Sequence, residues 1–383
     1  MSVISPMSYF LQKQTFRHIT KEQLEEIRPT DVYQAFKKAK QAGMDFAEHP
    51  QFGEIIHHLL DEFEKRKEAY ERSTIDRLNS AWRNFVSWCI QNNTQSLPAN
   101  AKTLEDFLKA RETQLHRDTL SVYLWAISKM HRITGCIDPT KDELVMGTYK
   151  RIRKTKVRQG EEIKQATPFL ESNLDHAIEV YRQDDSLKSK RDLAMLAVSY
   201  EGILRADELV RIKHKHIEFM PDGSAVLHIL FSKQNKSGKP DTNALSPCVA
   251  QLLKEYIEAG SLDERDEEDY LFIGISKHDS PFKPKRCSLG EPVYKPMTTR
   301  TTRNIFKKAW ETLGLADFSH ERPFTGHSPR VGAAQDLLRQ GFSTAQIQQS
   351  GRWKTANMVT QYGRAILAEQ GAMAQSRKYK KLN

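Results

Sequence analysis

Hydrophobic residues between positions 29 and 133 recur every three or four residues, which is the spacing of one buried helix face. Residues 1–25 show only weak periodicity, and we interpret them as a flexible N-terminal arm. The segments that follow predict helices at residues 29–43, 52–70, 74–91, 103–115 and 119–133. Ser73 is expected to cap the third of them. Together these segments predict an all-helical domain over residues 26–149.

Beyond residue 168 the pattern becomes mixed. Helical spacing is found at residues 171–181, 193–204, 246–259 and 298–313. Residues 225–231 are mostly apolar and predict a strand, whereas residues 232–241 contain Gly238 and Pro240 and predict a turn. Residues 243–245 fit the returning strand. The chain is therefore expected to be mainly α, with an α+β domain over residues 169–383 that contains a small antiparallel sheet.

The stretch from residue 325 to residue 364 predicts three short helices. Ser328 is a good N-cap, and Pro329 fits the first turn, where its missing N–H has no partner to lose. Gly341 lies where that helix would stop in a left-handed conformation. Ser343 is expected to cap a second helix that ends at Gly351. Thr355 is expected to cap a third, which carries Tyr362 in its last turn.

The charge of the chain favours a polyanionic partner. Its net charge is +10. The excess is local, because six of the nine residues at 150–158 are basic and four more basic residues crowd positions 377–381. We interpret residues 150–168, which end in Pro168, as a basic linker between the two domains. Such runs favour nucleic acid as the partner.

Several classes of protein are not supported by the sequence. The four cysteines, at 89, 136, 248 and 287, show no Cys-x-x-Cys spacing and are typical of reduced thiols in the cytoplasm. No His-Glu-x-x-His motif is present, and Ser237-Gly238-Lys239 lacks the first glycine of a phosphate-binding loop, so no metal or nucleoside triphosphate is expected. No run of eighteen apolar residues and no signal peptide is found, so no membrane association is expected.

The candidate chemistry comes from residues far apart in the chain. His327 and Arg330 project on one side of a helix start, where the dipole attracts anions. Alone, they fit a helical subdomain with a surface arginine and core aromatic residues. The ordered set Arg205, Lys233, His327, Arg330, Trp353 and Tyr362 changes this interpretation. It resembles the catalytic set of the tyrosine site-specific recombinases of the phage integrase superfamily, with spacing similar to the Cre-like branch.

The resemblance implies a mechanism. Tyr362 would attack a DNA phosphodiester and form a 3′-phosphotyrosyl intermediate, with its pKa lowered by the surrounding cations. Arg205 and Arg330 would neutralise the charge that grows on the phosphate, with His327 as a third donor. Lys233 would protonate the departing 5′ oxygen. Glu208 would orient Arg205 or His327, and Trp353 would supply an indole N–H or a packing wall. The stored ester energy would allow rejoining with neither ATP nor metal, so no cofactor is expected.

The resemblance also implies a partner and an assembly. The two domains would close round double-stranded DNA as a C-shaped clamp, on target sites built from inverted-repeat half-sites. The side chains expected to contact DNA are Arg77, Ser80, Arg83, Arg117, Thr119, Arg151, Arg153, Lys154, Lys236, Arg300 and Arg303. In a homotetramer on paired sites, a C-terminal helix at Ile366 to Ala374 would dock on a neighbour, although its apolar side also suits its own domain. The resemblance further implies a cytoplasmic protein that would act in the bacterial nucleoid and be encoded by a plasmid or phage.

Two alternatives stay open at this point. Residues 334–350 fit a helix-turn-helix with Gly341 in the turn, so the chain is also compatible with a non-catalytic DNA-binding regulator. The same tyrosine chemistry also serves type IB topoisomerases and telomere resolvases. Replacing Tyr362 separates the first alternative from recombination, and a demand for two inverted half-sites separates the second.

Overall fold

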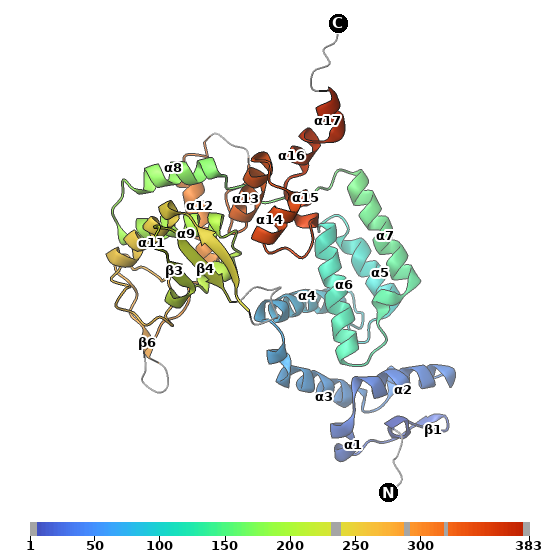
Figure 1. Ribbon diagram of the computed structural model, residues 1–383. Helices are drawn as coiled ribbons and strands as arrows, with labels where there is room; N and C mark the ends of the chain where they lie inside the picture. The colour runs from blue at the N-terminus through green and yellow to red at the C-terminus, as the bar shows by residue number, and fades with distance from the viewer. Residues whose placement is uncertain (1–5, 231–238, 287–291, 318–320, 378–383) are drawn as a thin grey trace. The chain divides into compact units, whose positions relative to one another are not determined.

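The computed structural model describes residues 6–230, 239–286, 292–317 and 321–377 (Figure 1). The chain divides into two compact units, Met1–Ile163 and Lys164–Asn383. Across the described ranges, every helix is too short or too polar to span a lipid bilayer. The unit boundary falls after the basic stretch, so the catalytic candidates other than Lys233 can be followed within the second unit.

From residue 6 on, the first unit forms packed secondary structure, although the sequence predicted a flexible arm over residues 1–25. Its first part contains two 3₁₀ turns, a two-stranded hairpin and three helices: η1 (Pro6–Tyr9), β1 (Leu11–Gln12), β2 (Thr15–Phe16), α1 (Lys21–Glu26), α2 (Pro29–Gln41), η2 (Phe46–Glu48) and α3 (Phe52–Lys65). Phe10 is fully buried and packs edge-to-face on Phe46, with ring centroids 5.1 Å apart. The Gln51 side chain bonds both backbone groups of Ile19, at 2.7 and 3.0 Å. Long-range aromatic packing therefore orders a segment that lacks helical periodicity.

The rest of the first unit is a helical bundle, as predicted. Its elements are η3 (Lys67–Ala69), α4 (Arg72–Gln91), α5 (Ala101–Arg111), α6 (Arg117–Ile133), η4 (Pro139–Lys141) and α7 (Glu143–Arg158). Phe85, Trp88 and Phe107 form the centre of its core through edge-to-face contacts. The expected cap of α4 is wrong, because the helix already begins at Arg72 and Ser73 lies inside its first turn.

The basic stretch is helical in its first half, which corrects the expectation of a linker at residues 150–168. Helix α7 continues to Arg158 because Val145 and Ile152, on one face of it, are fully buried against the bundle. Five of the six basic residues are exposed on its other faces, whereas Lys156 lies on the face of Ile152 and pairs with Glu161 at 2.8 Å. Only after Gly160, which has a φ of +80°, does the chain run without helix to residue 170.

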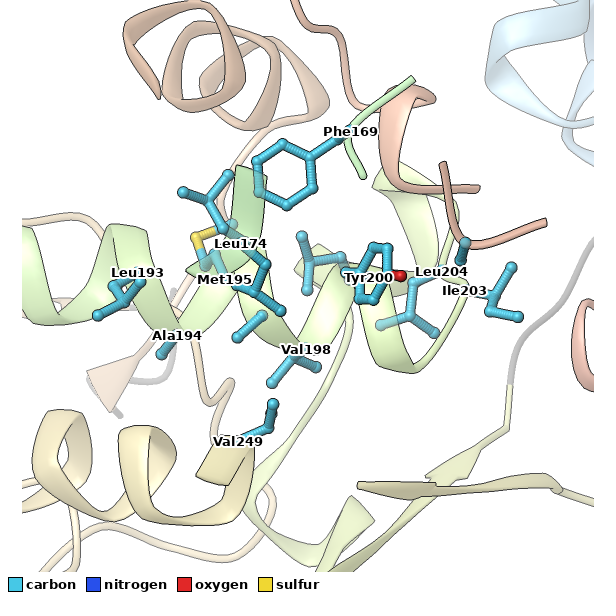
Figure 2. Close-up of a cluster of buried hydrophobic side chains, with 14 of the residues drawn as sticks. Phe169, Leu174, Leu193, Ala194, Met195, Val198, Tyr200, Ile203, Leu204 and Val249 are labelled. Carbon is cyan, nitrogen blue, oxygen red and sulfur yellow. The ribbon is translucent and has the colours of Figure 1, made fainter. Parts of the chain in front are cut away.

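The second unit is built round one buried helix. Its first elements are α8 (Glu171–Tyr181), α9 (Leu187–Glu201), α10 (Ala206–Val210), η5 (His214–His216), β3 (Ile217–Phe219), β4 (Ala225–Ile229), β5 (Asp241–Leu245) and α11 (Pro247–Ala259). Nearly every residue of α9 is buried, because α8, α11 and α13 (Ser328–Arg339) all pack against it. Figure 2 shows this packing, with Met195 and Val198 of α9 among Phe169, Leu174 and Val249. The end of α9 therefore has a fixed position, which matters because Arg205 follows it.

The predicted sheet is three-stranded and antiparallel, in the order β3-β4-β5. Leu227 of β4 pairs with Asn243 of β5, and Ala225 pairs with Leu245. The expected turn between these strands, including Lys233 and Lys236, lies mostly outside the described residues. A further short hairpin joins β6 (Lys285–Arg286) and β7 (Pro292–Val293).

The C-terminal part has the helices that the sequence predicts up to Tyr362, with different caps. The single helix expected at residues 366–374 is wrong, because two short helices separated at Gln370 and Gly371 lie there. This part contains α12 (Thr299–Thr312), α13, α14 (Thr344–Ser350), α15 (Asn357–Tyr362), α16 (Arg364–Glu369) and α17 (Ala372–Arg377). Ser343 caps α14 and Gly341 has a φ of +89°, so both predictions are confirmed. Ser328 is not the N-cap of α13 but its first residue, and its hydroxyl accepts the Thr325 N–H instead. Thr355 is likewise not a cap, since Ala356 precedes α15.

Candidate active site

The turn after α9 places Arg205 at the start of α10. Ile203 has a φ of +46°, so the chain reverses sharply between the two helices. The backbone N–H of Arg205 donates to Glu208 Oε2 at 2.9 Å, and Arg205 Nη1 donates to Glu208 Oε1 at 2.6 Å. A glutamate three residues into a helix thus caps the backbone and holds the arginine side chain at once. Glu208 orients Arg205, which is one of the two partners expected for it.

Arg330, in the first turn of α13, is almost completely buried. Its Nη1 donates to the carbonyl oxygen of Ile203, and its Nη2 donates to that of Gly351 at 2.9 Å. Its guanidinium lies 4.9 Å from the ring centroid of Trp353. Burial and the nearby charge of Arg205 lower the pKa of Arg330, but a guanidinium remains protonated at neutral pH. Arg330 therefore joins three segments and keeps a positive charge between them.

Tyr362, the last residue of α15, meets His327 at the start of α13. The Tyr362 hydroxyl and His327 Nε2 are hydrogen-bonded at 2.7 Å. Tyr362 also packs edge-to-face on Trp353, and both aromatic residues are 5% exposed. Gln335 Nε2 donates to the Tyr362 carbonyl at 2.9 Å and fixes the end of α15. The phenol is therefore held beside a histidine, and two arginines are near enough for their charges to act on it.

The pKa of Tyr362 differs from the expectation. Burial raises the pKa of Tyr362 above its ordinary value, and the opposing charges of Arg330 and Arg205 do not fully compensate. The expectation of a lowered pKa is therefore wrong, because burial of the phenol raises its pKa by more than the two cations lower it. Deprotonation of Tyr362 thus needs a neighbour that accepts its proton.

His327 is placed to be that acceptor, because its Nε2 is hydrogen-bonded to the Tyr362 hydroxyl, and its lowered pKa makes it a neutral but weak base. Burial of its ring, with the charges of Arg330 and Arg205, lowers its pKa to about 4. Other parts of the residue are exposed to solvent, which moderates this effect. The imidazole is neutral at neutral pH, and its Nε2 can receive the phenol proton.

Two residues that sequence reasoning missed support the turn that presents Arg205. Arg352 Nη2 donates to Glu208 Oε2 at 3.0 Å, and Asn243 Nδ2 donates to the Gly202 carbonyl at 2.9 Å. Arg352 stands between two residues of the predicted set in the sequence, but no spacing rule points to a charged residue there. Within the described ranges, no group of His, Cys, Asp and Glu side chains is arranged to hold a metal ion.

The expected DNA contacts lie on three helices of the first unit and one of the second. Arg77, Ser80 and Arg83 are on α4, Thr119 is on α6, Arg153 and Lys154 are on α7, and Arg300 and Arg303 are on α12, all of them exposed. Two other candidates have partners within their own unit. Arg117 is 12% exposed and donates to the Glu161 carbonyl at 2.7 Å, and Arg151 forms two bonds of 3.1 Å with Glu112.

Comparisons with known proteins identify the family. The phage integrase family pattern matches residues 169–367. The recombinase Cre of Escherichia phage P1 is 31% identical over 324 residues, which are 84% of this chain and 92% of Cre. A XerD homologue of Selenomonas ruminantium, an integrase/recombinase, is 24% identical over 311 residues, or 78% of this chain and 84% of that protein.

Solved structures agree on the fold. The integrase of the Tn1549 transposon, in complex with transposon right end DNA, aligns with a TM-score of 0.53 at 12% identity and covers 82% of this chain and 98% of its own. The XerH recombinase on its difH substrate aligns with a TM-score of 0.50 at 14% identity, over 91% of this chain and 85% of that one. The family match and the 31% identity with Cre establish that the chain belongs to the phage integrase family of tyrosine site-specific recombinases.

Proposed function

We propose that this chain cuts and rejoins DNA strands at a specific site, with Tyr362 as the nucleophile. The observation that carries the proposal is the hydrogen bond between Tyr362 and His327 beside two arginines. A buried phenol next to fixed cations and a neutral imidazole has few structural uses. It matches the needs of attack on a phosphodiester, whose anion repels nucleophiles and whose alkoxide leaving group is poor.

In the cleavage step, His327 accepts the Tyr362 proton as the phenolic oxygen bonds to phosphorus. Arg205 and Arg330 bind the non-bridging oxygens and stabilise the charge of the pentacoordinate transition state. The bond from phosphorus to the 5′ oxygen breaks, and that oxygen takes a proton from Lys233, which lies outside the described residues. The protonated His327 then adds a third donor. Trp353 packs on Tyr362 and under Arg330, which favours the packing role among the two considered for it.

The reverse sequence joins a strand. A 5′ hydroxyl attacks the 3′-phosphotyrosyl ester, Lys233 takes its proton, and His327 returns a proton to Tyr362. Because the ester keeps the energy of the original phosphodiester, rejoining requires no external energy source. A new partner strand at this step gives recombination, whereas the original strand gives relaxation of supercoils.

The partner is double-stranded DNA, and the exposed basic faces of α4, α7 and α12 are its proposed contacts. On α12, Arg300 and Arg303 have the fork that matches guanine O6 and N7 in a major groove. We further propose inverted-repeat half-sites and a tetramer on paired sites. The helix expected to dock on a neighbour is interrupted at Gln370 and Gly371, so α17 with its exposed Met373 is the part left for that contact.

The test is covalent capture by the phenol. Tyr362→Phe protein is first used to select its binding sequence from a random duplex library. Wild-type protein is then mixed with that duplex carrying a nick near the presumed cleavage point, so that rejoining is blocked. We expect a covalent protein–DNA adduct with the wild type and none with Tyr362→Phe, which should bind the duplex equally well.

Tyr294→Phe is the matched control, since the Tyr294 ring lies 4.1 Å from the guanidinium of Arg265, which is not one of the catalytic candidates. It should form the adduct at the wild-type rate. An adduct with Tyr362→Phe would refute the assignment of the nucleophile. A wild type that binds its site and never forms an adduct would favour the DNA-binding regulator.

A further inference from the structure

Arg352 occupies an unusual position between the α14 helix and Trp353. Its φ is +52°, in the left-handed region that favours glycine. Its side chain is only 6% exposed although it carries a charge. A long cation rarely adopts this backbone and is rarely buried unless specific bonds compensate. The contacts of Arg352 should therefore show what holds it there.

Those contacts converge on the turn that presents Arg205. Arg352 Nη1 donates to the Gly202 carbonyl at 3.1 Å, and Nη2 donates to the Ile203 carbonyl at 3.2 Å. The same Nη2 donates to Glu208 Oε2 at 3.0 Å. Glu208 in turn bonds both the backbone and the side chain of Arg205. Arg352 thus donates both to the backbone of the turn and to the carboxylate that orients Arg205.

The charges of this group favour the same interpretation. Burial raises the pKa of Glu208, but the charges of Arg352 and Arg205 and the bonds from Arg205 outweigh it, so the pKa is lowered and the carboxylate is ionised. Glu208 alone would cancel the charge of Arg205. With Arg352 present, its guanidinium balances the Glu208 carboxylate, and the positive charges of Arg205 and Arg330 both remain for a DNA phosphate.

A second residue ties the sheet to the same point. Asn243 Nδ2 donates to the Gly202 and Ser350 carbonyls, at 2.9 and 3.3 Å. Arg352 Nη1 also reaches the Ser350 carbonyl, at 3.4 Å. Asn243 lies on β5, after the turn expected to contain Lys233. Arg352 and Asn243 therefore share two carbonyl acceptors and join α9, α14 and the hairpin.

We propose that Arg352 is a positioning residue of the strand-cleavage reaction: it fixes Arg205 through Glu208 and the Gly202–Ile203 carbonyls, and it balances the Glu208 carboxylate. It does not touch the reacting atoms. The inference rests on the proposed function, because it assigns Arg205 to the DNA phosphate. The proposal makes a specific prediction: loss of the Arg352 side chain should lower the rate of strand cleavage much more than the affinity for DNA.

The experiment compares Arg352→Gly with Arg352→Lys. Glycine suits a φ of +52°, so the first variant removes the side chain without straining the turn. Lysine keeps the charge facing Glu208 but not the planar fork that reaches several acceptors. Lys354→Ala, which removes a neighbouring exposed cation, controls for loss of positive charge near the DNA. Each protein is assayed for the rate of adduct formation at saturating protein, affinity for the selected duplex, and melting temperature.

We expect Arg352→Gly to form the adduct about 10- to 100-fold more slowly, because misplacement of a group that binds the reacting phosphate has effects of this size. Its affinity for the duplex should stay within about threefold of wild type. Arg352→Lys should recover part of the lost rate. Lys354→Ala should lower affinity only and leave the saturated rate unchanged.

Two results would overturn the proposal. One is a wild-type rate for Arg352→Gly. The other is a rate loss, equal in both Arg352 variants, that follows the fraction of unfolded protein, which would indicate a structural role only. Should Arg352→Gly fail to fold, Arg352→Lys decides alone. A slower rate at full occupancy in a fully folded Arg352→Lys protein supports the positioning role, and a wild-type rate overturns it. A wild-type protein that forms no adduct would instead refute the proposed function together with this inference.

Discussion

Gly332 offers the sharpest test of how the second unit is assembled. It lies in α13, two residues after Arg330, where the helix touches the backbone of Phe169. A Cβ on Gly332 would be 1.7 Å from the Phe169 carbonyl oxygen and 2.3 Å from its carbonyl carbon. Close carbon–oxygen contacts are about 3.3 Å, so the two backbones would have to separate by roughly 1.6 Å. No side-chain rotation can relieve this clash.

The expected magnitude combines opposing effects. Alanine is more favourable than glycine inside a helix by about 1 kcal/mol. Overpacking against a rigid neighbour costs about 1–3 kcal/mol, and separation would also weaken the 3.1 Å bond from the Phe169 N–H to the Ser328 carbonyl, worth about 1 kcal/mol. Gly332→Ala should therefore destabilise the second unit by about 1–3 kcal/mol, and its melting temperature should fall by roughly 2–4 °C for each kcal/mol.

Calorimetric melting of the whole chain measures this effect, with Gly147→Ala as the matched control. Gly147 is an exposed residue of α7, and a Cβ there would meet nothing within 4 Å. The control should gain about 1 kcal/mol of stability from helix propensity alone. The packing argument would be refuted if Gly332→Ala raised the melting temperature as Gly147→Ala does. Adduct formation should also slow in Gly332→Ala, since a shift of α13 moves Arg330 and His327.

Two further predictions concern the two units separately. His131 is fully buried, accepts the Ala99 N–H at its Nε2 and has a pKa lowered by burial, so stability of the first unit should be full above pH about 6.5 and decline as pH falls below it. His131→Gln should lose less stability between pH 7.5 and 5.5 than wild type in paired melts, and equal losses would contradict the assignment. Arg330→Lys should reduce adduct formation by about 100-fold or more, because one ammonium cannot bond both the Ile203 and Gly351 carbonyls and also a phosphate. Single-turnover cleavage at saturating protein measures this, and a rate within tenfold of wild type would count against the role of the fork.

Local rules predicted most of the helices because each one carries its own signal. The range of α8 was predicted without error, and Ser343 with Gln346 forms a capping box that the sequence shows directly. Ser328 failed the same rule. Its hydroxyl bonds the Thr325 N–H, because the tight turn before α13 offers that donor first. A cap is therefore decided by the preceding turn as well as by the residue type.

Long-range packing explains what the sequence did not reveal. The N-terminal segment has no helical stripe, and its order depends on aromatic partners such as Phe46, more than thirty positions away. Arg352 was missed for a related reason, since its acceptors at Gly202 and Ile203 are about 150 positions away. A non-glycine residue in the left-handed region is visible only in a structure. The catalytic candidates could be identified from the sequence because they resemble the catalytic set of a known family, whereas no local pattern connects them.

The turn at Gly135 has a practical consequence for anyone who shortens this chain. Gly135 has a φ of +70°, and a Cβ there would lie 2.1 Å from the Pro29 carbonyl oxygen. Cys136, next to it, is buried in the aromatic core that the N-terminal segment forms with Phe10, Phe36, Phe46 and Phe52. Deleting the first sixty or so residues would uncover that thiol and the underside of the bundle. This N-terminal segment is thus part of the core of the first unit. Tags or fusion partners should therefore be added to it and should not replace it.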